Sequence, residues 1–430
     1  MIETHRIADD DFAALATGCG GPAVIRALWR GQRSKRLLLL RLLVQRWPAP
    51  TRERDHALAV LAGAESRAPT AVGDVLAQPM VGAWATSTLR LLRKGWPGRW
   101  PIRVELGHLG PIAAVAALRA GLDAELVGYA RAGWLSLPAV GRLALDVSEG
   151  AAVQLSTRAG RLLVQGTEID DTAPTWQPVR RLGVSRAAIP IDVALDDIDP
   201  YRDAYHVPAA DRLSTAEVSR WRRLFVDTWR ILTRHAPVRA SELAAGLQSM
   251  VPLTKPDARA ARSATVREAV GVVGLDLPAS AADFAVALVH EFQHSKLTAV
   301  IDIVPLYDGS STETFFAPWR ADPRPVGGLF QGTYAFLGVA DTWRSLSEDG
   351  IAFPEAERRF AEAREQVSVA VATLAGCGLL TPAGQRFVDG MAEAAADLRE
   401  IPLTAQVTSA AKAALEHRRE AWRRRNGRSG

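Results

Sequence analysis

Cysteine is nearly absent from this sequence, which has 430 residues and only two of them, Cys19 and Cys377. They lie far apart, and neither has a second cysteine at C-x-x-C spacing. This excludes a disulfide framework and a cysteine-rich zinc site. We expect both to be buried or incidental thiols.

Long hydrophobic runs are also lacking. The leucine run at 37–40 is flanked by Arg36 and Arg41, so it is too short to cross a bilayer. The N-terminus has neither the basic start nor the apolar core of a signal peptide. These features predict no membrane segment and a cytoplasmic location.

A large excess of one charge is missing as well, since 52 Lys and Arg face 47 Asp and Glu. Arginines cluster between residues 418 and 428, but no aromatic residues alternate with them on a basic face and no nucleic-acid-binding module is recognisable. We expect no nucleic-acid partner. The tail is interpreted as a solvated helix end favoured by the helix dipole, and the alternative is a contact with an acidic partner.

The patterning divides the chain into three regions. Residues 1–122 show helical spacing of apolar residues, and 123–205 contain short alternating runs with a hairpin turn at Ala159-Gly160. Residues 206–430 return to helical periodicity, with a capped helix predicted over 214–235 and a strand over 268–275. The acidic stretch 192–203 lacks the glycine and terminal glutamate of a calcium loop, and it is interpreted as a solvated linker.

One run in the third region combines groups suited to metal chemistry: His290-Glu291-Phe292-Gln293-His294, an H-E-x-x-H pattern inside an apolar helix. Ser280 and Asp283 form a capping signal at its start. Residues four apart share a helix face, so both imidazoles can bind one ion. Glu291 lies about 100° around the axis, where we expect it to reach a metal-bound water more easily than the metal. The alternative is a polar patch without metal, which would be costly in so apolar a helix.

Two stretches follow this helix. Residues 315–325 contain three prolines, a tryptophan and two arginines, which predicts a stiff loop. A second helix is predicted from Val326 to about Leu346, and this is where we expect a third metal ligand.

Four motifs together resemble a known family. They are HEFQHSKL at 290–297, APWRADPRP at 317–325, GGLFQGTYAFLGVADTW at 327–343 and SKRLLLLRLL at 34–43. The chain resembles, over nearly its whole length, the HEXXH-motif peptide-modifying proteins of actinobacterial ribosomal peptide clusters, and also an extension found on some radical SAM maturases.

The resemblance implies an iron(II)- and 2-oxoglutarate-dependent dioxygenase that hydroxylates the β-carbon of a residue in a ribosomally synthesised precursor peptide (RiPP biosynthesis). His290 and His294 then become iron ligands, and the precursor peptide and a partner maturase become the expected partners. Arg320 and Arg324 are candidates to bind the distal carboxylate of 2-oxoglutarate, because a guanidinium matches a carboxylate bidentately. The alternative is that either arginine only braces its loop.

The third ligand is open at this point. Asp302 would lie about 12 Å further along the helix than His294, which excludes it unless the helix breaks. Asp308, Glu313 and Asp341 are candidate carboxylates. Gln331 lies on the following helix in the most suitable surroundings, although a facial triad normally uses a carboxylate. We therefore name Gln331.

Two other functions are weighed against the hydroxylase. One is a zinc metallopeptidase in which Glu291 is the general base that activates metal-bound water. The other is a degenerate metal-site protein that only binds a precursor or another maturase. The expected fold class is mainly α with a small antiparallel β-element (α+β) and a zincin-like HExxH helix in the C-terminal half.

Overall fold

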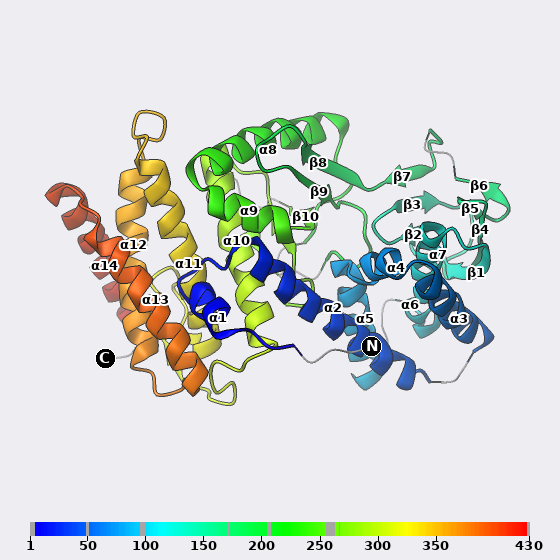
Figure 1. Ribbon diagram of the computed structural model, residues 1–430, viewed down its shortest axis with the longest axis horizontal. Helices are drawn as coiled ribbons and strands as arrows, with labels where there is room; N and C mark the ends of the chain where they lie inside the picture. The colour runs from blue at the N-terminus through cyan, green and yellow to red at the C-terminus, as the bar shows by residue number, and fades with distance from the viewer. Residues whose placement is uncertain are drawn as a thin grey trace.

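The computed structural model describes residues 5–48, 51–94, 100–169, 172–203, 208–254, 263–265 and 267–427. The molecule is elongated (Figure 1). Small sheets and N-terminal helices form one end, a mixed sheet with α8–α10 lies in the middle, and α12–α14 form the other end.

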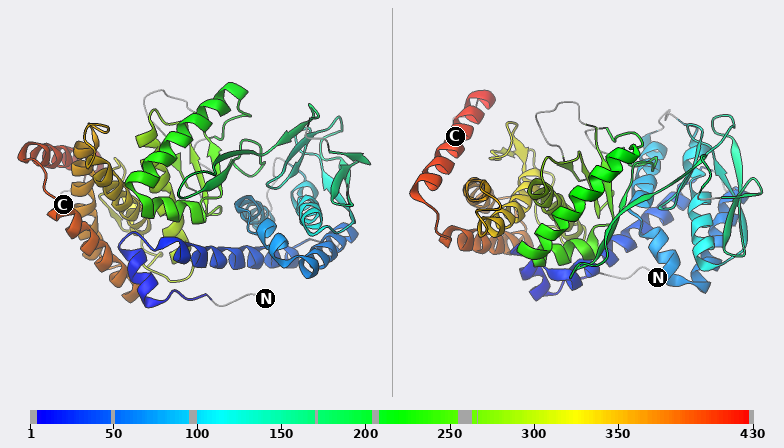
Figure 2. Two further views of the ribbon diagram at one scale, coloured as in Figure 1. Left: turned by 45° about the horizontal axis from the view of Figure 1, so that its top comes forward. Right: turned by 90° about the horizontal axis from the view of Figure 1, so that it is seen from above.

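The first described stretch is helical. Its helices are α1 (Asp9–Ala16), α2 (Gly21–Gln45), α3 (Arg52–Arg67), α4 (Pro69–Leu76), α5 (Pro79–Lys94), α6 (Ile102–Leu106) and α7 (Leu109–Ala120). In the left view of Figure 2 the long helix α2 runs below the middle of the molecule toward the end that holds the small sheets.

The start of the chain packs against its C-terminal half. Phe12 of α1 meets Phe387 of α13 (Pro382–Glu400) with ring centroids 5.4 Å apart. Trp29 of α2 meets Phe292 of α10 (Ala281–Ile301) at 5.6 Å. The helices of residues 1–122 are therefore shared between both ends of the molecule.

Two small antiparallel sheets cover α7. One has the order β1-β4-β5-β6 and the other β2-β3-β7. Their strands are β1 (Ala124–Tyr129), β2 (Trp134–Leu137), β3 (Gly141–Ala144), β4 (Ala152–Arg158), β5 (Arg161–Val164), β6 (Thr167–Glu168) and β7 (Trp176–Pro178). The predicted hairpin is confirmed: β4 pairs with β5, and Ala159 and Gly160 both have positive φ, as a type I′ turn requires.

The central sheet was not predicted. Its order is β11-β12-β10-β9-β8, with β9, β10 and β12 parallel. The strands are β8 (Arg180–Val184), β9 (Ile191–Leu195), β10 (Ser249–Pro252), β11 (Ser263–Ala264) and β12 (Val272–Leu275). The strand expected over 268–275 is thus shorter, and the sheet joins residues from both sides of the expected boundary at 205.

The interpretation of 192–203 as a solvated linker is wrong. Asp196, Asp197 and Asp199 are buried. Asp197 accepts from Arg180 at 2.9 Å and also pairs with Arg212, which compensates its burial. The stretch contains the end of β9 and an internally bonded turn.

The remaining elements are mostly long helices. They are α8 (Thr215–His235), α9 (Pro237–Gly246), α10 (Ala281–Ile301), the pair β13 (Thr314–Phe315) and β14 (Arg324–Pro325), α11 (Val326–Ser347), α12 (Ala356–Ala375), α13 (Pro382–Glu400) and α14 (Ala405–Asn426). The capping box at Ser214 and Glu217 is present, and the mainly α class is confirmed. Within the described residues no single helix is long and apolar enough to cross a bilayer, and only the sharply bent pair α1–α2 passes that test together.

Candidate metal centre

The two histidines of the H-E-x-x-H run converge as the helical spacing predicts. The Ser280 side chain accepts from the Asp283 backbone N–H, and α10 begins at the next residue after Ser280. The Nε2 atoms of His290 and His294 lie 3.2 Å apart. Both atoms can therefore lie about 2.1 Å from one metal ion.

Glu291 lies closer to this point than the sequence suggested. Its Oε1 is 3.7 Å from His290 Nε2, and one ligand atom from each of the three residues lies within 4.8 Å of the others. Thr265 donates its hydroxyl to Glu291 Oε2 at 2.5 Å. The Glu291 side chain is almost fully buried. Thr265 holds its Oε2 atom, and its Oε1 atom lies near His290.

Gln331 contacts the opposite side of His294. The two side chains join through His294 Nδ1 and Gln331 Oε1 at 3.0 Å, and Gln331 Nε2 donates to Thr298 Oγ1 at 3.2 Å. A proton on Nδ1 leaves the lone pair of Nε2 free for a metal. In this arrangement the Gln331 amide oxygen faces His294 Nδ1, on the other side of the ring from Nε2.

The electrostatic surroundings keep His290 neutral. Burial is the largest effect and lowers the pKa of His290 to about 4. His294 also lowers this pKa, and the negative charge of Glu291 partly opposes both effects by raising it. A neutral imidazole at physiological pH is the form that binds a metal.

An aromatic wall, formed by Phe336 and Trp319, flanks the site. The ring of Phe336 on α11 meets His290 edge-on, with centroids 5.4 Å apart. Trp319 stacks on the other face of this wall, 4.5 Å from Phe336. These rings limit water access to the histidines from the side of α11.

The structure does not bring either predicted arginine into contact with the triad among the described residues. Arg320 Nε donates to Asp322 at 2.9 Å, and Arg324 reaches the same carboxylate at 3.4 Å. Arg320 lies in the loop before β14 and Arg324 is the first residue of β14, and the Arg324 guanidinium lies beside Gly328.

Three of the other carboxylates weighed as ligands are engaged elsewhere, and the fourth, Glu313, is exposed just before β13. Asp302, at the end of α10, pairs with Lys35 at 2.6 Å. Asp308 accepts from Ser310, and Asp341 pairs with Arg239. Among described residues, His290, Glu291 and His294 form the only group of His, Cys, Asp or Glu suited to hold a metal.

No protein-family model and no curated protein sequence matches this chain.

Sequence reasoning missed a buried network that holds α10 in place. Lys296 is fully buried and donates to Glu242 at 2.8 Å and to the Gly18 carbonyl at 2.7 Å. Glu242 also accepts from the Gly20 N–H. Burial raises the pKa of Glu242, but the charges of Lys296 and Arg239 outweigh it and hold that pKa below its usual value. A lysine within an apolar helix was the available signal.

Proposed function

We propose that this protein is an iron(II)- and 2-oxoglutarate-dependent hydroxylase that acts on the β-carbon of a residue in a ribosomally synthesised precursor peptide. The convergence of His290, Glu291 and His294 within 4.8 Å supports a bound metal ion, and the four motifs of the resemblance support the hydroxylase and its peptide substrate. Two histidines and one carboxylate are the ligand set of non-haem iron(II) oxygenases.

The residues present fit such an ion after a small shift of Glu291, because ligand atoms bound at about 2.1 Å to one ion lie at most about 4.2 Å apart and the triad spans up to 4.8 Å. The two imidazoles are spaced for one metal, and the buried carboxylate neutralises part of its charge. Three protein ligands leave open positions for a co-substrate and O₂. Bound iron would supply the oxidation of a C–H bond, in which 2-oxoglutarate and O₂ yield succinate, CO₂ and the hydroxylated peptide.

The chain's own residues would orient and shield this chemistry. Gln331 and Thr265 fix the ligand directions through hydrogen bonds to His294 and Glu291. Phe336 keeps water from one side of His290. Arg324 is the candidate that we choose for the distal carboxylate of 2-oxoglutarate, because its contact with Asp322, at 3.4 Å, is longer than the 2.9 Å contact of Arg320.

A zinc peptidase is less well supported. It needs Glu291 as general base, and its three protein ligands would then have to include one beyond the histidines. No further His, Cys, Asp or Glu joins the group within the described part of the chain.

We also propose that the fold around α10 is zincin-like. The feature that supports this is the packing of α10 against α8 and against the edge of the mixed sheet.

Metal analysis tests the proposal. Protein purified without oxygen should contain iron in preference to zinc, and His290→Ala and His294→Ala should lose it while their circular dichroism stays unchanged. With iron, 2-oxoglutarate and air, the wild-type protein should form succinate. Zinc at full occupancy, with no succinate after exchange for iron, would contradict an oxygenase.

A further inference from the structure

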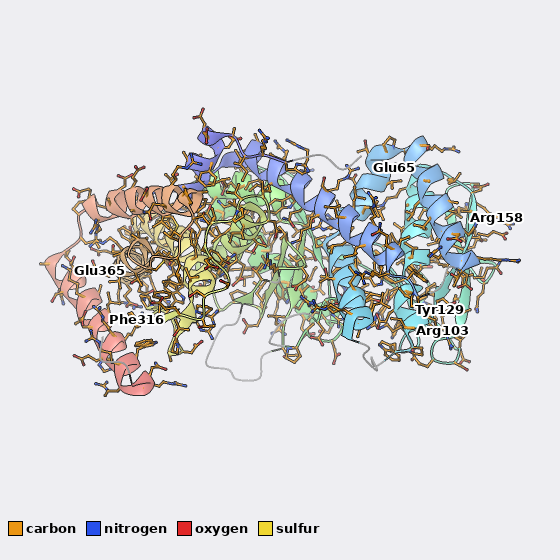
Figure 3. All side chains as sticks on the ribbon, turned by 90° about the horizontal axis from the view of Figure 1, so that it is seen from below. Glu65, Arg103, Tyr129, Arg158, Phe316 and Glu365 are labelled. Atoms are coloured by element: carbon orange, nitrogen blue, oxygen red, sulfur yellow. The ribbon has the colours of Figure 1, made fainter. Side chains whose placement is uncertain are left out.

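A second feature lies on the far side of the aromatic wall. A cavity of about 630 Å³ opens between the 318–321 loop and helices α11, α12 and α14. Trp319, Phe336, Trp343 and Trp422 form its aromatic surface. Trp422 is also packed against Phe316, which Figure 3 labels near the C-terminal helix.

Two buried polar atoms on residues lining this cavity have no hydrogen-bond partner. They are the indole Nε1 of Trp422 and the amide Oε1 of Gln366. Both residues are more than nine-tenths buried, at 7% and 5% exposed. Leaving such groups unpaired is costly. Neither atom is exposed to solvent, so a ligand reaches them only when a neighbouring side chain moves aside. One is a donor and the other an acceptor, so a ligand that satisfies both must offer an acceptor and a donor.

The cavity is lined by four arginines, Arg320, Arg359, Arg418 and Arg425, and by one carboxylate, Glu362. Arg320 and Arg359 pair with carboxylates outside the lining, Asp322 and Glu355. Glu362 already accepts from Arg358 at 2.7 Å and lies 3.5 Å from Arg418. Arg425 makes no ion pair with a carboxylate among the described residues. A ligand of this cavity is therefore expected to be anionic.

The cavity is next to the metal centre. Phe336 lines it and also contacts the ring of His290. A segment bound there lies one aromatic ring away from a metal ligand.

We propose that this cavity binds an extended acidic segment of a peptide substrate, which rests on the function proposed above. A peptide backbone offers a carbonyl for Trp422 Nε1 and an N–H for Gln366 Oε1. Acidic side chains complement the arginines, and the rings accommodate apolar ones. A small dicarboxylate has only acceptors at neutral pH, so it would leave Gln366 Oε1 unsatisfied.

Binding to the metal-free protein tests this without requiring catalysis. The probe is a fluorescein-labelled peptide of about ten residues, built from Gly, Ser and Leu with glutamates at three positions. A second peptide carries lysines at those positions, and glutarate serves as competitor. We expect the acidic peptide to bind at least about tenfold more tightly than the basic one, and glutarate not to displace it.

Two variants and one control locate the site. Arg425→Gln should weaken the acidic peptide about two- to fivefold, and Trp422→Phe, which removes only the indole donor, about three- to tenfold. Arg423→Gln, on the same helix but outside the cavity lining, should bind like wild type.

Equal binding of the two peptides, displacement by glutarate, or equal losses in Arg423→Gln and Arg425→Gln would overturn the proposal. Since no metal is present, these results do not depend on whether the triad is an oxygenase. A failed succinate assay with intact peptide binding would reject the chemistry and keep the cavity's assignment.

Discussion

Gln331 gives the sharpest test of how the metal site is built. Gln331→Leu removes the partner of His294 Nδ1 while keeping the side chain's approximate volume. Loss of such an outer partner lowers metal affinity about 10- to 100-fold, which is about 1.4–2.7 kcal/mol. The measurement is a competitive titration of iron or zinc against a chelator of known affinity.

A matched control separates orientation from ligation. Thr298→Val removes only the group that holds Gln331 Nε2, so its effect should be smaller than that of Gln331→Leu. His294→Ala marks the loss of a true ligand. Affinity within about twofold of wild type would refute the orienting role, whereas a loss as large as that of His294→Ala would make Gln331 the third ligand predicted from the sequence.

Three further predictions concern the triad, the arginines and the buried network. If Glu291 is a ligand, Glu291→Gln should lower metal affinity by at least about 100-fold and abolish succinate formation. A Glu291→Gln protein that keeps its full metal content and loses the ability to hydrolyse a peptide would favour the peptidase. Arg324→Lys should raise the 2-oxoglutarate concentration needed for half-maximal rate, while Arg320→Lys, at the cavity, should mainly weaken peptide binding; the reverse pattern would exchange their roles. Lys296→Met should cost about 3–5 kcal/mol of unfolding free energy in urea, because it leaves the Glu242 charge buried without its partner. That contribution is full above the unfolded pKa of Glu242, about 4.3, and it is lost as the pH falls through the lower folded pKa. Wild type and Lys296→Met should therefore have similar stability in acid. A loss under about 1 kcal/mol at pH 7 would contradict a stabilising role of the Lys296–Glu242 pair.

Local signals in the sequence predicted α10 well. Ser280 caps α10 and Ser214 caps α8, and each cap depends on residues within one turn of chain. The convergence of His290 and His294 follows from the helical repeat alone. These features need no knowledge of tertiary packing, which is why the sequence was sufficient.

Features that depend on distant partners could not be predicted in this way. The acidic stretch resembled a linker because Asp197 is neutralised by two distant arginines. These are Arg180 and Arg212, which lie 15 or more residues away in the sequence. The parallel strands β9, β10 and β12 are four or five residues long, and such short apolar runs give no distinctive periodicity. The orientation of Glu291 depends on Thr265, which is 26 residues earlier in the chain.

The packing of α10 explains how a helix with two histidines, a glutamate and a lysine is stable in a mostly apolar interior. Each polar group has a separate compensation: Lys296 is paired with Glu242, Glu291 accepts from Thr265, and His294 is joined to Gln331. The ring of His290 meets only the other triad members and Phe336 in the described contacts. Its Nε2 has no described partner other than His294 Nε2 and the Glu291 carboxylate, and a cation bound by the triad would replace these contacts. The same ring contact with Phe336 joins this site to the cavity, so binding of a peptide and binding of a metal would meet at one side chain.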